Sequence, residues 1–459
     1  TYTALFGTGS GHDSNGIVQL RLAAKGAYSG RVRYEGVSYS ISGSLNNHGA
    51  LARNLSRPGK SPLQLALRVD ALNGSNLLTG TLIDGGLTLD VSARRATWHI
   101  RSNPAPQAGK YTCLFLSGSS SRSDGAPLGD GYGFFKVGAD GSCAYSGRLA
   151  DGTVFTGSTY LLFSGDADLY MGLYSSKGSL YGSLDFANLT GISDFSGVIR
   201  WTKPSRVTDK RYPAGFTTSG HVVASRYNPP ARGQTALQLP SGTVAIRDGG
   251  LAASGLTVDV TQNTSGRYFA VPPTSGLQLS VIPSNGLFRG SFKHPDSNAT
   301  TSFVGAALQK QNSAGATFFS GNLSGSVELG TLLSDRDLVP YSASATGLPL
   351  AIPDNNTTGV TSSISFSGSG TVIRASISLA ISHTYRGDLE VSLIYPGGNI
   401  EVLHNRVGGS EDNLFFTDLP LASAAGVAKA GTWSLKVRDL AGADIGSIQS
   451  WSLKLMVRP

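Results

Sequence analysis

Long apolar runs are absent from this chain of 459 residues. Its uninterrupted apolar stretches contain only a handful of residues, whereas a helix that crosses a bilayer needs about 18 to 20. The sequence therefore predicts no transmembrane helix. The chain also does not open with a charged segment and an apolar core, but in a strand pattern, with Thr1-Tyr2-Thr3-Ala4-Leu5-Phe6. We expect an extracellular or cell-surface protein whose signal peptide has already been removed.

Charged residues are scarce as well, at 14% of the chain. The polar surface must then be built largely from Ser, Thr, Asn and Gly, a composition that is typical of extracellular β proteins and unlike that of helix-rich cytosolic enzymes. No window of about a dozen residues has the three-and-four spacing of apolar residues that marks an amphipathic helix. These absences predict an all-β protein.

Cysteine is nearly missing, because only Cys113 and Cys143 are present. At most one disulfide can form, and only in an oxidising compartment. Both residues lie at the starts of strands that we expect to be neighbours, which makes them a disulfide candidate. A chain of this length does not need a covalent link for its stability, so two buried free thiols are the alternative.

Glycine, in contrast, is abundant, with 60 residues that follow no three-residue period. Collagen is therefore excluded and turn-rich β-structure is favoured. Several of these glycines interrupt alternating strand patterns, where a glycine marks a bulge or a close approach of two backbones. The sequence thus predicts strongly curved antiparallel sheets, as barrels or sandwiches. Examples of the pattern are Leu77-Leu78-Thr79-Gly80-Thr81-Leu82 and Leu287-Phe288-Arg289-Gly290-Ser291-Phe292.

The formal net charge is +8, and it is unevenly distributed. Residues 340–459 contain nine acidic and eight basic residues, so the preceding part carries +9. This balance favours an anionic glycan or a negatively charged cell surface as a partner. The basic residues are scattered singly, however, with no cluster of four or more, and this pattern favours an ordinary solvated surface over such a partner. No basic stripe with interleaved aromatic residues is present, so we do not expect nucleic acid as a partner.

The first two segments of the chain repeat each other with a period of about 105 residues, which is the size of a domain rather than of a solenoid repeat. Both segments end alike, with Trp98 before Pro104 and Trp201 before Pro204. Two motifs also recur. The recurring motifs are Tyr2-Thr3-Ala4-Leu5-Phe6 with Tyr111-Thr112-Cys113-Leu114-Phe115, and Gly26-Ala27-Tyr28-Ser29-Gly30-Arg31 with Cys143-Ala144-Tyr145-Ser146-Gly147-Arg148.

This periodicity predicts tandem β domains, because the chain is too long for one hydrophobic core. The third segment has the same hairpin pattern only in its second half, so it is either a divergent third domain or the completion of the barrel before it. A segment of small residues bounded by Pro340 and Pro349 then predicts a linker. The predicted boundaries are 1–106, 107–212 and 213–338 for three β domains, 339–349 for the linker and 350–459 for a C-terminal domain.

The C-terminal domain has the clearest strand pattern of the chain. Apolar residues alternate with mainly polar ones from Ile373 to Ile381, and again in the segments that begin at Leu389, Trp433 and Trp451. Alternation of this kind places one face of each strand in a core. We predict a β-sandwich with Trp433 and Trp451 inside it.

Five motifs of this domain carry a resemblance to a known family, in family order and spacing. They are Ile352-Pro353-Asp354-Asn355-Asn356, His383-Thr384-Tyr385-Arg386-Gly387-Asp388-Leu389, Asp412-Asn413-Leu414, Gly431-Thr432-Trp433-Ser434-Leu435 and Ser450-Trp451-Ser452-Leu453. The domain resembles the P domain of proprotein convertases and of kexin-like bacterial proteases. The resemblance implies a jelly-roll-like β-sandwich, which in those proteases packs on the catalytic domain and stabilises it.

The upstream segments are similar in pattern to glycine-rich β repeats of secreted bacterial surface proteins, so we expect a bacterial source. A subtilisin-type catalytic domain would need Asp, His and Ser in that order, with the Ser in a Gly-Thr-Ser sequence at the start of a helix. That string does not occur in this chain. The seven histidines are isolated and contain no zinc-binding pair. We therefore predict a protein that is not an enzyme.

Calcium is the cofactor that the sequence favours, because Ca²⁺ needs several loop oxygens rather than a fixed motif. Four acidic residues lie in expected loops of the C-terminal domain, and we predict that they converge on Ca²⁺: Asp388, Glu411, Asp412 and Asp418. The alternative is that Asp388 pairs with Arg386 or caps backbone amides in its turn.

Two functions are compatible with these patterns. The first is a structural or adhesive surface protein, in which tandem β domains form a rigid scaffold that assembles with further copies into fibres or a lattice. The second is a secreted binding module, either for a glycan or for a separately encoded protease that the C-terminal domain would cap.

Overall fold

The computed structural model of the chain describes residues 1–7, 11–69, 76–118, 125–189, 191–252, 254–273, 276–332 and 338–459, without the side chains of Thr417, Asp418, Pro420 and Ala422. The chain divides into two compact units, Thr1–Asp335 and Arg336–Pro459. Within the described ranges the regular structure consists of strands and three-residue 3₁₀ turns, which confirms the all-β prediction. None of the helical segments described is long and apolar enough to span a membrane.

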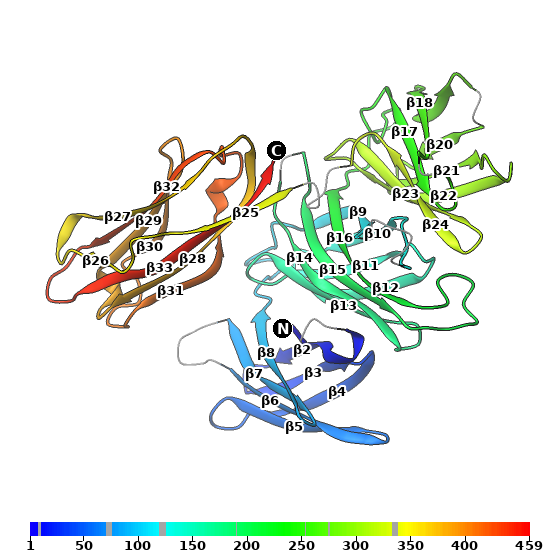
Figure 1. Cartoon of the computed structure of the whole chain (residues 1–459). Helices are drawn as coiled ribbons and strands as arrows, with labels where there is room; N and C mark the ends of the chain where they lie inside the picture. Colours follow the sequence, from blue (N-terminus) through cyan, green and yellow to red (C-terminus); the bar gives the residue numbers. More distant parts are fainter. Residues whose placement is uncertain are drawn as a thin grey trace. The chain divides into compact units, whose positions relative to one another are not determined.

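The first sheet contains eight antiparallel strands, and Figure 1 shows them curling into a barrel-like wall. Its order is β4-β3-β2-β1-β8-β7-β6-β5, so that the first and last strands are hydrogen-bonded and the fourth and fifth are the two edges. The strands are β1 (Tyr2–Gly7), β2 (Asn15–Leu22), β3 (Ala27–Tyr34), β4 (Val37–Ser44), β5 (Ala50–Arg57), β6 (Lys60–Val69), β7 (Leu77–Asp84) and β8 (Leu87–Arg95).

The second sheet repeats this topology, with the order β12-β11-β10-β9-β16-β15-β14-β13. Its first strand corresponds to the first strand of the preceding sheet, as the repeated Tyr-Thr motif predicted. The strands are β9 (Gly109–Ser117), β10 (Gly131–Val137), β11 (Ser142–Arg148), β12 (Val154–Tyr160), β13 (Asp166–Leu173), β14 (Gly178–Asp185), β15 (Phe195–Lys203) and β16 (Phe216–Arg226).

The third segment is a closed barrel of eight strands in chain order, so it is a complete third copy and not the end of the preceding barrel. Here the fourth and fifth strands, β20 and β21, are hydrogen-bonded from Gln278 opposite Ser291 to Val281 opposite Phe288. The strands are β17 (Ser241–Asp248), β18 (Leu256–Gln262), β19 (Arg267–Val271), β20 (Gln278–Val281), β21 (Leu287–Lys293), β22 (Thr300–Leu308), β23 (Ser313–Ser320) and β24 (Leu323–Leu329).

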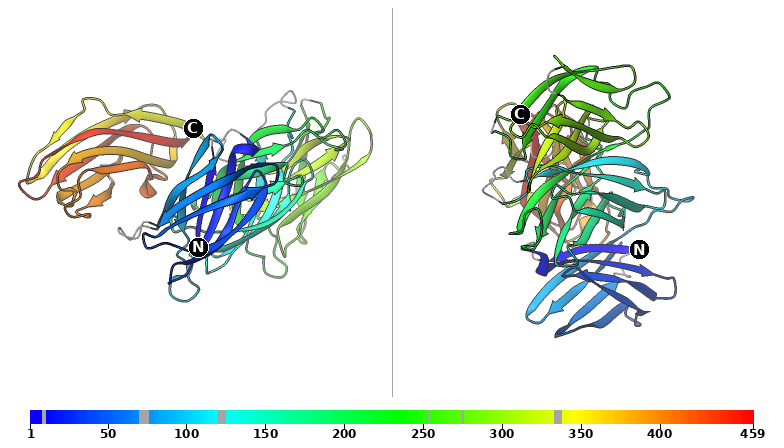
Figure 2. Two further views of the ribbon diagram at one scale, coloured as in Figure 1. Left: turned by 90° about the horizontal axis from the view of Figure 1, so that it is seen from below. Right: turned by 90° about the vertical axis from the view of Figure 1, so that its right-hand side faces the viewer.

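Glycines inside the strands allow this curvature. A Cβ atom on Gly80 would lie 1.9 Å from the carbonyl oxygen of Ala66 on the neighbouring strand, and one on Gly290 would lie 2.1 Å from that of Gln278. No other residue fits such a close approach of two backbones. Figure 2 shows the resulting curl of the strands from two further directions.

The edges of the first sheet are joined by side chains instead of a backbone ladder. Arg53 on β5 donates through Nη2 to the carbonyl oxygen of Ser42 on β4, at 3.0 Å. The guanidinium of Arg53 also lies 5.5 Å from the ring centre of Tyr28. An unpaired strand edge is a template for pairing with another chain, and here an arginine covers part of it.

Two predicted boundaries are wrong. Strand β16 pairs with β9 and β15, so the second sheet extends to Arg226 and is not complete at residue 212. The repeat of Trp98 and Trp201 was misleading, because Trp98 follows the last strand of its sheet whereas Trp201 lies in the seventh strand, β15. The predicted linker 339–349 is also not free, since it contains a strand of the C-terminal unit.

The C-terminal unit, called the P-like unit below (residues 338–459), contains two antiparallel sheets around one core. One sheet has the order β25-β33-β28-β31 with β26 also paired to β33, and the other has the order β27-β32-β29-β30. The strands are β25 (Val339–Ser344), β26 (Leu350–Ile352), β27 (Asn356–Phe366), β28 (Thr371–His383), β29 (Leu389–Ile394), β30 (Ile400–Asn405), β31 (Leu414–Pro420), β32 (Gly431–Asp439) and β33 (Gly446–Arg458). Trp433 and Trp451 are buried in the core, as predicted.

Buried contacts join successive barrels of the N-terminal unit. Asp168 of the second sheet accepts from the backbone nitrogen of Leu5 at 3.3 Å and pairs with Arg94 of the first sheet at 3.1 Å. Apolar side chains of the second sheet and the third barrel share a further buried cluster. That cluster contains Leu114, Leu116, Val223, Ala306, Leu308 and Leu332.

Candidate functional site

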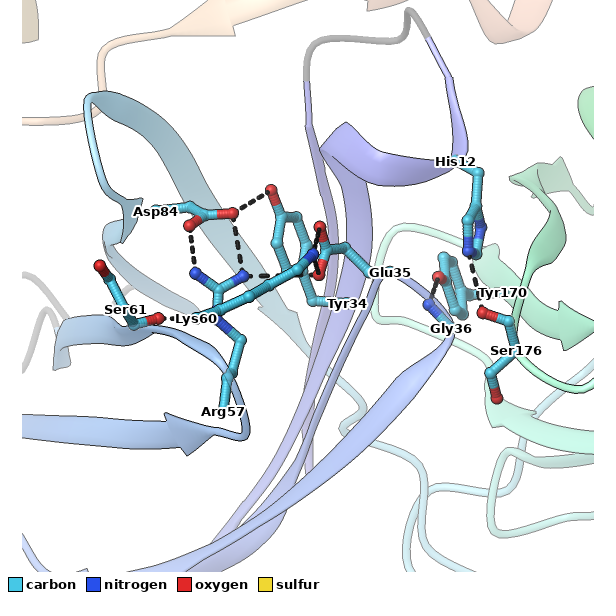
Figure 3. Close-up of polar contacts among 10 residues, drawn as sticks. All are labelled: His12, Tyr34, Glu35, Gly36, Arg57, Lys60, Ser61, Asp84, Tyr170 and Ser176. Atoms are coloured by element: carbon cyan, nitrogen blue, oxygen red, sulfur yellow. Dashed lines mark hydrogen bonds and ion pairs between the residues drawn. The ribbon is translucent and has the colours of Figure 1, made fainter.

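A network of charged side chains lies at one end of the first sheet, where three of its hairpin turns meet (Figure 3). Arg57 at the end of β5 pairs with Asp84 at the end of β7, with Nη1 and Oδ2 at 3.1 Å. The same guanidinium reaches Glu35 in the β3–β4 turn at 3.4 Å, and Lys60 pairs with Glu35 at 2.9 Å. The hydroxyl of Tyr34 donates to Asp84 at 3.2 Å.

The electrostatics of this network match its geometry. The hydrogen bond from Arg57 holds the pKa of Asp84 below its ordinary value, since the guanidinium stabilises the carboxylate. Burial raises the pKa of the Tyr34 hydroxyl, and the neighbouring Asp84 raises it further. Each of the four charged groups has an oppositely charged partner, so the network joins turns instead of supplying a reactive acid or base.

The same end of the first sheet contacts the second sheet (Figure 3). The hydroxyl of Tyr170 accepts from the backbone nitrogen of Gly36 at 3.1 Å, and Nε2 of His12 lies 3.2 Å from the carbonyl oxygen of Ser176. His12 is buried, at 7% exposure. These contacts give His12 a structural role at the junction.

A second network occupies corresponding turns of the second sheet. The ammonium of Lys203 pairs with Asp209 and lies 4.4 Å from the ring centre of Tyr174. The Tyr174 hydroxyl donates to Asp151 at 2.8 Å and accepts from Nε1 of Trp201 at 2.9 Å. Burial raises the pKa of Tyr174. Lys203 and Asp151 are both buried, so this network is closed to a substrate and its role is also structural.

The structure does not assemble the predicted calcium site from the members that it describes. Glu411 pairs with Arg386, Asp412 is exposed, and Asp388 is buried in the 3₁₀ turn that precedes β29. Among the described residues, no three His, Cys, Asp or Glu side chains converge as metal ligands. The side chain of Asp418, in β31, lies outside the described residues. The alternative was that Asp388 pairs with Arg386 or caps backbone amides in its turn, and the structure pairs Arg386 with Glu411.

The predicted disulfide is wrong, and the alternative of two buried free thiols is correct. Cys113 on β9 lies opposite Gly133, and Cys143 on β11 lies opposite Val137, four residues further along the intervening strand β10. Two strand spacings and four residues separate them by more than about 10 Å, whereas a disulfide needs Cα atoms within about 7 Å. Burial raises the pKa of Cys143 to about 12 and that of Cys113 as well.

A groove of about 650 Å³ lies on the third barrel and is called the arginine groove below. It lies over strands β19 to β22, and two rows of side chains cross it. In one row Arg267 lies opposite Ser280, which lies opposite Arg289. In the other, Phe269 lies opposite Gln278, which lies opposite Ser291. The lining also includes Tyr268, Ala270, Pro273, Gly276, Leu277, Leu279, Gly290, Ser302, Phe303 and Val304.

The arginine groove combines cationic, hydroxyl and aromatic groups. Arg267 and Arg289 are exposed, and no carboxylate lines the groove. Phe269 is 49% exposed, although Tyr268 beside it is buried at 1%. Such a set can hold an anionic ligand by charge and orient it through hydroxyl and ring contacts. It contains no acid, thiol or histidine for covalent or proton-transfer chemistry.

Sequence analysis missed this groove because its arginines are separated along the chain. In the sequence Arg267 and Arg289 are two of the scattered basic residues. Only the pairing of β20 with its two neighbours brings them into one row. One signal was available, since alternation in β19 places Arg267 and Phe269 on the face opposite to Tyr268 and Ala270. The signal is an aromatic ring beside a cation on the outward face of one strand.

Comparison with known families confirms the resemblance of the C-terminal segment. Residues 372–455 match the Proprotein convertase P-domain. The chain therefore contains a P domain that begins and ends inside the P-like unit. The match covers a minority of the chain, and the three barrels lie outside it.

Curated relatives share this same part of the chain. Leupeptin-inactivating enzyme 1 of Streptomyces exfoliatus is 43% identical over 104 residues, which are 22% of this chain and 23% of that protein. The transglutaminase-activating metalloprotease of Streptomyces mobaraensis is 36% identical over 105 residues, 23% of this chain and 14% of the relative. A calcium-dependent protease of a Nostoc species is 35% identical over 112 residues, 23% and 17% of the two chains. The chain thus spans less than a quarter of the length of these relatives.

Proposed function

We propose that this chain is a non-enzymatic extracellular protein of bacterial origin, in which three linked barrels form a rigid scaffold with a structural or adhesive role. The observation that carries the proposal is the buried junction between barrels. Asp168 is 2% exposed and contacts both Arg94 and the backbone of Leu5 in the preceding sheet. A charge pair whose carboxylate is buried at a junction fixes the relative position of two domains, as adhesion or assembly requires.

The absence of catalysis is supported by how the polar groups are used. The two charged networks, around Arg57 and around Lys203, are paired internally and hold turns together. The test is a panel of peptide and glycoside substrates offered to the full chain. No turnover is expected. Hydrolysis that disappears on replacement of a single acidic residue contradicts the proposal.

Assembly with further copies of the chain is supported by the two edges of the first sheet, which have no backbone ladder between them. Strands β4 and β5 lack the backbone pairing that β20 and β21 have in the third barrel, and unpaired edges favour strand addition between chains. Negative-stain electron microscopy of the full chain, with light scattering over a concentration series, tests this. Ordered fibres or lattices are expected, and a monomer at every concentration contradicts assembly while leaving a non-assembling scaffold in place.

A second candidate function is favoured by the P-like unit. Its edge strands β30 and β31 expose apolar side chains, with Ile400 at 62%, Val402 at 55% and Phe415 at 67% exposure. Large exposed apolar groups mark interaction sites, and the relatives that share this domain are proteases by name. The candidate function is the capping of a separately encoded protease.

Capping is tested by mixing the full chain with purified secreted bacterial proteases that lack a P domain of their own. We expect a longer protease half-life at elevated temperature with the natural chain. The triple variant I400S/V402S/F415S serves as the comparison, and equal protection by both chains contradicts a role for this surface.

Stabilisation of the P-like unit by calcium is proposed as well. Its support is that two relatives which share the domain are named calcium-dependent proteases. Thermal unfolding in calcium, in magnesium and in chelator is the test. A higher midpoint in calcium alone is expected, and identical midpoints contradict the proposal.

A further inference from the structure

We propose that the arginine groove of the third barrel binds an acidic polysaccharide. The proposal deepens the adhesive function proposed above and rests on it, because it names the ligand to which the scaffold would attach. It follows from the charge, the spacing and the chemistry of the side chains that cross strands β19 to β22.

The charge of the groove is not neutralised by the protein. Arg267 and Arg289 flank Ser280 in one row, and the structure gives neither guanidinium an ion pair within its described residues. On the same barrel Arg247 is different, since it pairs with Glu328 at 3.4 Å. Like charges gathered in one row of a sheet, without a carboxylate in that row, are unfavourable in the free protein. An anionic ligand relieves that repulsion.

The spacing of the two arginines fits a ligand with repeated charges. They are separated by two strand spacings, so their Cα atoms lie about 10 Å apart. A single small anion cannot lie in close contact with both guanidinium groups unless the long side chains fold toward each other. A polymer that carries anionic groups along its length meets both arginines in extended conformations, and each can form paired hydrogen bonds to a carboxylate or sulfate.

The second row of the groove favours a saccharide over an acidic peptide. Phe269 offers an exposed ring face, and Gln278 and Ser291 beside it offer an amide and a hydroxyl. A sugar ring presents an apolar face edged by hydroxyl groups, which is the pattern complementary to this row. An acidic peptide would use the arginines but leave the hydroxyl and ring contacts largely unmade.

The groove is also preformed. It lies on the outer face of strands whose inward side chains are fixed in the barrel core, with Tyr268 at 1%, Leu279 at 4% and Phe303 at 2% exposure. The third barrel is the copy in which the fourth and fifth strands are paired, and the two rows cross that pair. A site held by continuous backbone pairing loses little conformational entropy on binding. The acidic residue Asp259 on the neighbouring strand β18 lies opposite Val271. It is therefore in the row next to that of Phe269, outside the two rows that cross the groove.

The test measures binding of the full chain to four immobilised polymers: a polyuronate, a sulfated glycosaminoglycan, uncharged dextran and polyglutamate. We expect binding to the polyuronate or to the sulfated polymer, weakening as salt is raised, and no binding to dextran. In the double variant R267Q/R289Q the affinity should fall at least tenfold. In F269S the affinity for the polysaccharide should fall at least threefold while that for polyglutamate is unchanged.

The matched control is Arg247→Gln, which removes one positive charge from the same barrel away from the groove. Equal losses for R247Q and for each groove single variant, R267Q and R289Q, overturn the proposal, because binding would then follow net charge. Stronger binding to polyglutamate than to both acidic polysaccharides assigns the groove to an acidic protein and also overturns it. Absence of binding to every polymer overturns it too, whereas the scaffold function is decided separately by microscopy.

Discussion

The imidazole of His383 and the carboxylate of Asp439 form a fully buried pair, with Nε2 and Oδ2 at 3.2 Å and neither side chain exposed. The other ring nitrogen, Nδ1, accepts from the backbone nitrogen of Tyr385 at 3.1 Å. The ring proton therefore lies on Nε2 and is donated to Asp439. This pair connects the end of β28 to the end of β32, and so joins the two sheets of the P-like unit.

Replacement of His383 by alanine should destabilise the P-like unit by about 3 to 5 kcal/mol, because it leaves the Asp439 carboxylate buried without its partner. Urea unfolding of the excised unit measures this loss. The control is Thr384→Ala, which removes a hydrogen bond from the exposed Thr384 to Asp444 and should cost only about 1 kcal/mol. Similar losses of stability in the two variants would show that the buried pair contributes no more than the hydrogen bond of Thr384.

The excised P-like unit should be more stable when it begins at residue 338 than at residue 350. The longer fragment retains β25, which pairs with β33 from Val339 opposite Val457 to Ser344 opposite Ser452. It also keeps Tyr341, whose ring centre lies 3.9 Å from the buried ammonium of Lys429. Thermal unfolding of the two fragments is the measurement. Equal midpoints would restore 339–349 to the role of a linker.

Arg94→Ala should loosen the junction of the first and second sheets. Asp168 would lose its cationic partner while remaining buried, at a cost of about 3 kcal/mol, and cleavage between residues 95 and 109 in limited proteolysis should accelerate. The neighbouring exposed Arg95, changed to alanine, is the control and should leave the cleavage rate nearly unchanged. A rate that rises equally in both variants would argue against the junction.

The same variant should depend on pH in a defined direction. Burial raises the pKa of Asp168, although Arg94 opposes this shift. An acid whose pKa is raised in the folded state contributes stability below its unfolded pKa, and this is lost as pH rises through the folded pKa. Arg94→Ala should therefore destabilise the junction less at pH 4 than at pH 8, as measured by hydrogen exchange in β1 and β13. A defect independent of pH would contradict this assignment.

Asp84→Asn should lower the stability of the first sheet by about 2 kcal/mol at pH 7, because a charged hydrogen bond to Arg57 is lost. The pKa of Asp84 is depressed, so its contribution is present above the ordinary value of 3.8 and is lost as pH falls through the folded pKa. The difference between natural and variant chains in hydrogen exchange of β7 and β8 should shrink below about pH 4. A constant difference down to pH 2 would rule out titration of Asp84.

Gly290→Ala should destabilise the third barrel by about 1 to 3 kcal/mol, because the added Cβ would meet a backbone oxygen that cannot move without breaking the sheet. Gly86→Ala is the control, since a Cβ there meets nothing within 4 Å. Thermal unfolding monitored by tyrosine fluorescence compares the two. Unchanged stability of Gly290→Ala would mean that β20 and β21 are further apart than described.

The sequence by itself determined what depends on neighbouring residues along the chain. Alternation placed Trp433 and Trp451 in the core, few charges and many glycines determined the all-β class, and the ordered motifs from Ile352 to Leu453 determined the P domain. The Tyr-Thr motif located the first strands of the first two copies. Each of these signals is local, because strand periodicity and family motifs depend on consecutive residues.

Only the tertiary structure decided which strands are neighbours. The neighbours of each strand determine which side chains lie close enough to act together. Register places Arg267 and Arg289 in one row and separates Cys113 from Cys143 by a whole strand. Strand pairing places β16 in the second sheet, and the folded chain pairs Arg386 with Glu411. Composition and spacing cannot supply this information, since a barrel brings residues together through backbone hydrogen bonds between distant segments, and every residue has the same backbone donor and acceptor.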